Sequence, residues 1–174
     1  MRALPRCIFS STVALLALLP PVHAAENGTG CDKFAWLLMR EKAWFAASDK
    51  TNVASGETIA SLPKAAFIMR LKPGSEASFA LPPERAPRSA GQYGGTVSFA
   101  APEQPGIYQV TLSDDAWIDV IQDGRYARSV GSSGRSDCPG LRKSVRLELG
   151  PTFFVLQISS VISDSIIVAV SAGK

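Results

Sequence analysis

Histidine is the scarcest functional residue in this chain, because His23 is the only one among 174 residues. It falls within residues 1–24, which we expect to be a cleaved secretory signal, so the mature protein would contain no imidazole. A Ser-His-Asp or Cys-His catalytic device would then be impossible. Zinc, haem and non-haem iron sites that depend on histidine would be excluded too. We therefore expect no catalytic residues, no metal and no cofactor.

Long apolar runs are also missing, apart from a short one near the start. Residues 8–19 are mostly apolar, follow Arg2 and Arg6, and end at two prolines just before Val22-His23-Ala24. A transmembrane helix needs about 20 apolar residues, whereas this three-part pattern is typical of a signal peptide. The sequence predicts a periplasmic or secreted protein without a membrane span after cleavage. An uncleaved membrane anchor is the alternative.

Strong charge and abundant cysteine are absent as well. The formal net charge is only +3, and Arg2 and Arg6 would leave with the signal, so nothing favours nucleic-acid binding. Of the three cysteines, Cys7 would also be removed. The remaining pair, Cys31 and Cys138, is expected to form a disulfide in an oxidising compartment. Two separate buried thiols are the alternative.

The rest of the chain favours one helix followed by many strands. Residues 31–47 place apolar side chains at helical spacing, which predicts a helix that covers one end or edge of a sheet. Short β-branched and aromatic runs then alternate with Gly, Pro, Ser and Asp clusters, as strands and turns do. The expected strands are residues 65–71, 76–81, 95–101, 106–112, 115–122, 125–130, 143–149, 153–159 and 164–171.

This pattern predicts a mainly β fold, an antiparallel jelly-roll-like β-sandwich of about 8–9 strands with one N-terminal helix and one disulfide. We expect the signal peptide at residues 1–24, the helix and a linker at residues 25–64, and the sandwich at residues 65–174. The helix and the sandwich would together form one domain, since the length suits a single core.

Trp117 and Asp119 form the first candidate binding site. Residues two apart in a strand share one face, so both would lie on the same side of the strand at residues 115–122. An exposed Trp beside carboxylates could stack on a sugar or hold a cation such as calcium. Alternatively, Trp117 packs under the helix and the carboxylates are solvated turn ends.

Arginines around a Gly-Ser segment form the second candidate. Residues 131–134 read GSSG, and the basic residues on either side include Arg125, Arg128, Arg135 and Arg142. Free backbone N–H groups together with arginines can hold a phosphate or carboxylate, so an anionic glycan is a possible ligand. An ordinary solvated loop with outward charges is the alternative.

Ser61 and Lys64 also match S-x-x-K, the nucleophile motif of penicillin-recognising enzymes. That motif works at the start of a helix, whereas Pro63 lies inside it here. The S-D-N and K-T-G motifs that should follow are absent from the sequence. The match therefore gives little support to an enzyme.

Residues 95–122, GTVSFAAPEQPGIYQVTLSDDAWIDVIQ, resemble the bacterial pre-peptidase C-terminal type of domain. The shared features are a strand at residues 97–100, a Pro-Gly turn, a G-x-Y-x-V-x-L strand from Gly106, and an acidic-apolar strand at residues 115–120. The resemblance extends over roughly residues 65–171. It implies a jelly-roll-like sandwich with a non-catalytic accessory or binding role.

Residues 106–149 are similar to a group of small exported bacterial proteins, some of which carry the label homogentisate 1,2-dioxygenase. Members of the true dioxygenase family are much longer and bind iron through histidines, which the mature chain would lack. We therefore expect a non-catalytic binding or accessory module. Its partner is unknown; an anionic glycan or an envelope protein is possible. An enzyme and a structural envelope protein remain as alternatives.

Overall fold

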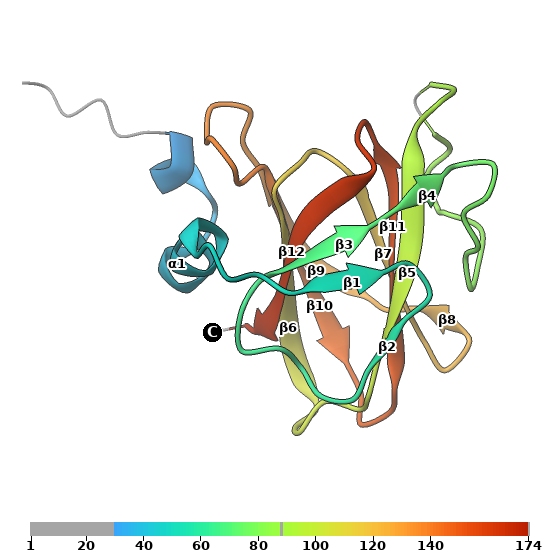
Figure 1. Ribbon diagram of the computed structural model, residues 1–174. Helices are drawn as coiled ribbons and strands as arrows, with labels where there is room; N and C mark the ends of the chain where they lie inside the picture. Colours follow the sequence, from blue (N-terminus) through green and yellow to red (C-terminus); the bar gives the residue numbers. More distant parts are fainter. Residues whose placement is uncertain (1–29, 88, 174) are drawn as a thin grey trace, which may run out of the picture.

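The computed structural model describes residues 30–87 and 89–173, in which two β-sheets pack face to face beside one short α-helix (Figure 1). The expected signal at residues 1–24 lies outside the described residues. In the part of the chain that is described, no helix has the length and apolar character needed to cross a membrane.

Six strands form the first sheet, sheet A, in the order β1-β3-β12-β6-β10-β9. Their bounds, in that order, are Asn52–Ala54, Phe67–Arg70, Ser165–Ala172, Gly106–Leu112, Lys143–Leu149 and Ser129–Gly134. Neighbouring strands are antiparallel except for β1 and β3, which are parallel. The short β1 therefore extends the edge of the sheet beside β3.

The second sheet, sheet B, has the order β2-β5-β11-β7-β8, and β4 pairs with β5 off this path. The bounds of β2, β5, β11, β7, β8 and β4 are Thr58–Ile59, Tyr93–Phe99, Phe154–Val161, Trp117–Gln122, Arg125–Tyr126 and Lys72–Pro73. Only β2 and β5 pair in parallel. The prediction of a mainly β, two-sheet fold with one helix is confirmed, although two parallel pairs interrupt its antiparallel order.

The core lies between the two sheets, because alternate side chains of each strand point inward. Phe99 of sheet B stacks on Phe154 at 5.0 Å between ring centroids and meets Phe67 of sheet A at 6.3 Å. All three rings are fully buried. Each buried side chain of this size contributes roughly 1.5–3 kcal/mol. The sandwich is thus held by apolar contacts across its middle.

Residues 30–47, which we call the N-terminal cover, lie on the outer face of sheet A. They contain the 3-10 turn η1 (Gly30–Lys33) and the helix α1 (Met39–Ala46). The Trp36 indole donates to Ser144 Oγ at 3.1 Å, and Ser171 Oγ donates to the buried Glu41 carboxylate at 2.8 Å. Because these serines belong to β10 and β12, the cover is tied to the outer side of the sheet.

The predicted helix at residues 31–47 is only partly correct. The α-helix begins at Met39, and residues 34–38 are irregular. Ala35 N–H donates to Ser133 Oγ of β9 at 3.0 Å, which draws this stretch out of a helical path. Leu37 is consequently 84% exposed while Glu41 is buried. Contacts with sheet A therefore override the apolar spacing that predicted one continuous helix.

The predicted strand at residues 76–81 does not form. The N–H groups of Ala80 and Leu81 bond to the side chain of Gln157 on β11 instead of to a neighbouring strand. The single strand expected at residues 125–130 is divided into β8 and β9, because the chain crosses from sheet B to sheet A there. The short strands β1, β2 and β4 were not predicted, since two or three residues carry no recognisable alternation.

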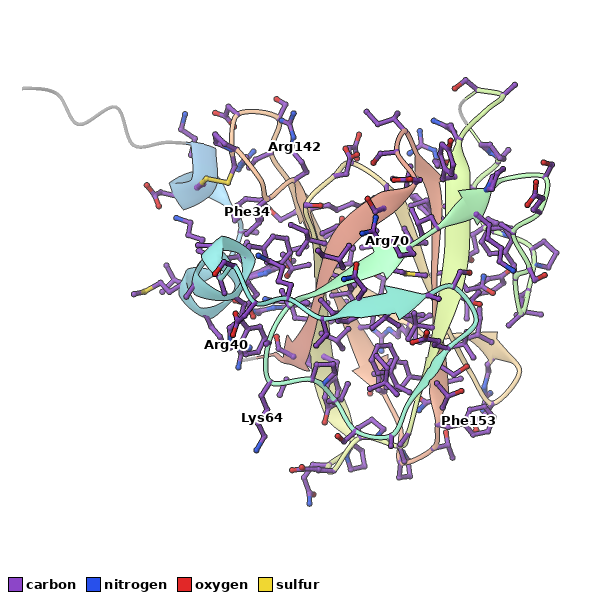
Figure 2. All side chains as sticks on the ribbon, in the orientation of Figure 1. Phe34, Arg40, Lys64, Arg70, Arg142 and Phe153 are labelled. Carbon is purple, nitrogen blue, oxygen red and sulfur yellow. A yellow bond between two sulfur atoms is a disulfide. The ribbon has the colours of Figure 1, made fainter. Side chains whose placement is uncertain are left out.

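The predicted disulfide between Cys31 and Cys138 is present, with the two Cα atoms 4.6 Å apart (Figure 2). Cys138 is buried with Phe34, Leu38 and Leu141 in a small second core beneath the N-terminal cover. The bond therefore fixes the start of the cover to the loop between β9 and β10.

Replacing both cysteines, C31S together with C138S, should lower the free energy of unfolding by about 2–5 kcal/mol, since the bond closes a loop of 107 residues. Urea denaturation under non-reducing conditions would measure the change. Reduced wild-type protein should match the variant. Equal stability of the variant and the oxidised wild type would contradict a stabilising role.

Candidate functional site

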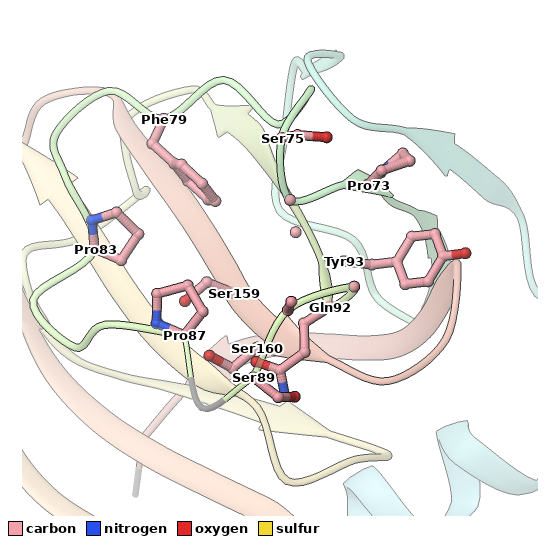
Figure 3. A pocket seen from close by; sticks show the side chains of 14 residues that line it. Pro73, Ser75, Phe79, Pro83, Pro87, Ser89, Gln92, Tyr93, Ser159 and Ser160 are labelled. Carbon is pink, nitrogen blue, oxygen red and sulfur yellow. The ribbon is translucent and has the colours of Figure 1, made fainter.

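A pocket of about 560 Å³ lies between the outer face of sheet B and the described parts of the β4–β5 loop, residues 74–87 and 89–92 (Figure 3). We call it the serine pocket. The side chains that matter below are Phe79, Pro83, Pro87, Tyr93, Ser159 and Ser160. All of its described lining residues are uncharged. The pocket is therefore formed by the loop on one side and by β5 and β11 on the other.

Two neighbouring hydroxyls, those of Ser159 and Ser160, lie in the wall of the pocket (Figure 3). The residues are only 5% and 7% exposed, and neither hydroxyl has a hydrogen-bond partner among the described residues. Buried polar side chains in folded proteins nearly always have a partner. Each unpaired hydroxyl costs about 1–3 kcal/mol. The pocket wall thus carries unused hydrogen-bonding capacity.

A β-bulge explains why consecutive residues both line the pocket. In a regular strand, Ser159 and Ser160 would point to opposite faces. The pairing of β11 with β5 shifts register between Ile158 and Val161, and Ser160 has a φ of 64°. A bulge places an extra residue opposite the partner strand and is often found beside functional sites. A positive φ at a serine costs about 1–3 kcal/mol, which the surrounding structure must offset.

The Phe79 ring forms an apolar wall because Gly94 lets it approach the sheet closely. A Cβ atom at Gly94 would lie 2.8 Å from Phe79 Cζ and 3.0 Å from the Ile158 carbonyl oxygen. Only glycine avoids this contact. Pro83 and Pro87 continue the apolar lining beside the two hydroxyls, whereas the Tyr93 ring points away from them and packs against the main core (Figure 3).

Gln157 on β11 holds the loop above the pocket. Its Oε1 accepts hydrogen bonds from Ala80 N–H at 2.5 Å and Leu81 N–H at 3.1 Å, and its Nε2 donates to the Leu81 carbonyl at 3.0 Å. Gln157 is only 1% exposed. The Gln157 amide therefore bonds the backbone groups of Ala80 and Leu81 that a neighbouring strand would otherwise pair.

Trp117 and Asp119, the first predicted site, lie together on β7. They contact the β4–β5 loop at Glu84 and Arg85. Asp119 accepts hydrogen bonds from the Trp117 indole at 2.8 Å and from Glu84 N–H at 3.3 Å. The Trp117 ring lies near Arg85, at 5.6 Å, and Lys143, at 4.9 Å. Two cations thus occupy the surroundings of the indole, which favours a structural role over stacking on a sugar. Trp117 packs with these side chains and the loop rather than under α1.

The Asp119 carboxylate is almost fully buried, at 3% exposure. Burial raises its pKa above 3.8, while the hydrogen bonds from Trp117 and Glu84 act in the opposite direction. Desolvation and the nearby carboxylates of Asp119 and Glu84 also raise the pKa of Tyr126. The Tyr126 hydroxyl donates to the Pro82 carbonyl, which adds another contact between the loop and sheet B.

The four predicted arginines do not converge on one site. Arg125 is on β8, and Arg128 forms an exposed ion pair with Glu148 at 3.6 Å. Arg135 donates to the Lys33 carbonyl and Arg142 to the Ser136 carbonyl, so both tie down the backbone around Cys138. This arrangement gives no common centre to which an anion could bind.

The Gly-Ser segment between the arginines is also not a free loop, contrary to expectation. Residues 131–134 belong to β9 and pair with β10. Asp114 and Asp115 line a cavity of about 480 Å³ together with Arg135 and Arg142, so carboxylates offset the positive charge there. Both findings weaken the case for an anion-binding loop.

Within residues 30–87 and 89–173, no three His, Cys, Asp or Glu side chains are grouped so that they could hold a metal ion. No family model, no curated protein and no solved structure matches the chain. The candidate site is therefore defined by its own geometry.

The serine pocket was not predicted from the sequence. The pair Ser159-Ser160 interrupts the apolar run of β11, which is the one available signal. That signal does not show that a bulge turns both side chains to the same face. Nor does it show that a loop about 80 residues earlier in the chain covers them.

The variant D119N should be less stable than the wild type by about 1–3 kcal/mol, because the amide offers one acceptor oxygen to two N–H donors. The variant D49N, at an exposed position, is a matched control.

The raised pKa of Asp119 means that its carboxyl group binds a proton more tightly in the folded state than in the unfolded state. Its contribution to stability should therefore fall as pH rises from 3.8 through the raised pKa. Urea denaturation across pH would show this in the wild type and not in D119N. Identical pH profiles for the two would refute the assignment.

Proposed function

We propose that the protein is a non-catalytic binding module, and that the serine pocket holds a small neutral ligand with an apolar face and one or two hydrogen-bonding groups. The observation that carries this proposal is the pair of buried hydroxyls of Ser159 and Ser160, which have no hydrogen-bond partner among the described residues and lie in a mainly apolar pocket. Both oxygens are covered in this conformation, and a rotation about χ1 would turn either of them toward a hydroxyl or carbonyl group of the ligand. Neutral sugars, which combine hydroxyls with an apolar face, belong to this class.

None of the described lining residues is charged, which supports a neutral ligand over an anionic one. A charged group placed between Phe79 and the prolines would lose its hydration, and the described lining residues offer it no partner of opposite charge. A volume of about 560 Å³ falls within the range of small-molecule pockets. Contact with the Phe79 ring, Pro83 and Pro87 would supply apolar area, while the serines would fix orientation. The anionic glycan expected from the arginines therefore fits this pocket less well.

The same lining supports binding rather than catalysis. A serine nucleophile needs an adjacent base to accept its proton. The described residues around Ser159 and Ser160 include no carboxylate, no lysine and no cysteine. Among the described lining residues, only Tyr93 has a titratable side chain. Either serine would therefore remain an ordinary hydroxyl.

The compartment forms part of the proposal. The Cys31–Cys138 disulfide fits an oxidising environment. We propose that residues 1–24 act as the signal that directs the chain to the periplasm or the medium. A jelly-roll-like strand order, and a role like that of pre-peptidase C-terminal-type domains, belong to the same proposal. Two sheets of mainly antiparallel strands support the strand order, and the role rests on the serine pocket.

The variants S159A and S160G should each raise the free energy of unfolding by about 1 kcal/mol, because both remove an unpaired hydroxyl and S160G also relieves a positive φ. T152V is the matched comparison: it also removes a buried hydroxyl without a partner among the described residues, so its stability should rise by a similar amount. Thr152 carries the third buried side-chain atom without a partner among the described residues, and it does not line the pocket. Urea denaturation would compare all three with the wild type. A loss of stability in S159A would show that the hydroxyl has a structural partner.

The same two substitutions, S159A and S160G, should weaken ligand binding although they raise stability. We expect ligand-observed NMR to detect neutral aryl glycosides, such as 4-nitrophenyl glucoside, and not 4-nitrophenyl phosphate. Affinity should fall roughly 5–10-fold in S159A and S160G, the effect of one lost hydrogen bond, and stay unchanged in T152V. If no neutral probe binds, or if binding is equal in all four proteins, the serine pocket is not the ligand site.

A further inference from the structure

A second cavity, of about 410 Å³, lies between α1, residues 60–64 and the end of β12. It is separate from the serine pocket and shares no residue with it. Its apolar lining includes Trp44, Leu62, Tyr108 and Val170. Tyr108 and Val170 also belong to the main core, so this cavity reaches the interior at an open end of the sandwich. We call it the Trp44 cavity.

Arg40 lies at this cavity with its guanidinium fixed in place. Its Nε and Nη2 donate to Glu41 Oε1 at 3.2 and 3.0 Å, and Nη2 also donates to the Ala172 carbonyl at 3.0 Å. The group lies over the Trp44 ring at 5.2 Å. Among the described residues, Nη1 has no acceptor. A guanidinium already ordered in this way loses little entropy when it binds a further oxygen.

Two more charged side chains line the cavity. Lys64 and Glu103 are both exposed, and neither forms an ion pair within the described residues. Figure 2 shows Arg40 and Lys64 on the same side of the sandwich. Glu41, which neutralises part of the Arg40 charge, is buried behind it against Ser171. The groups that an incoming anion would meet are thus Nη1 of Arg40 and the ammonium of Lys64.

We propose that the Trp44 cavity binds a small apolar carboxylate, such as an aryl-alkyl acid. Its apolar body would contact Trp44, Leu62 and Val170, and its carboxylate would accept hydrogen bonds from Arg40 and Lys64. The Glu103 carboxylate repels the bound carboxylate, so the affinity is lower than Arg40 and Lys64 alone would give. This site is independent of the serine pocket, so either one can fail without the other.

Isothermal titration calorimetry at low ionic strength with 3-phenylpropionate tests the proposal, with the neutral analogue 3-phenylpropanamide as the second probe. The full chain should bind the acid more tightly than the amide. K64M keeps most of the alkyl chain and should weaken binding of the acid about three- to fivefold, the size expected for an exposed charge. E103Q should strengthen it by a similar factor, because it removes a repulsive charge.

K72M is the matched control, since Lys72 is an exposed lysine on β4 that does not line the cavity. It should bind the acid as the wild type does. All three substitutions affect exposed side chains, so folding should be preserved. Equal affinity for the acid and the amide would overturn the proposal. So would equal effects of K64M and K72M, or weaker binding of the acid by E103Q.

Discussion

The loop that covers sheet B is attached next to the serine pocket by one side chain, Gln157. Its amide forms three hydrogen bonds with the backbone at Ala80 and Leu81, which have no neighbouring strand. Without this amide, those backbone groups would have to face water or remain unpaired beneath the loop. The loop then lies across β11, and the space left between the loop and the β-bulge is the serine pocket. The candidate site is therefore a consequence of how the loop is attached.

Both outer faces of the sandwich are covered in the same physical way. An antiparallel sheet commonly turns one polar face to water. Here irregular chain covers that face, so polar side chains such as Ser144 and Gln157 become buried and need partners. On sheet A the indole of Trp36 provides one, and on sheet B the loop backbone does. The disulfide strengthens the first cover, whereas the second is held by hydrogen bonds and by packing around Trp117.

The sequence was informative where a residue's environment follows from its neighbours. Strands β6 and β10 were predicted with their observed bounds because their apolar and polar residues alternate. Residues 31–47 and 76–81 were interpreted less well, since partners more than 70 residues away determine their conformation. Trp117 and Asp119 were correctly placed on one face of a strand. What they contact there depends on Arg85, Lys143 and the loop, which no local pattern reveals.

Ser159 and Ser160 show why part of the site could not be predicted. For stability alone, alanine and glycine would suit these two positions better, since both hydroxyls are buried without a partner among the described residues and Ser160 has a positive φ. Local rules and the observed structure therefore disagree at this point. Such disagreements are expected where a protein binds something, because the ligand supplies what the fold lacks. The bulge that strains Ser160 is also what brings it into the same pocket wall as Ser159, so the strain and the geometry of the proposed site have one origin.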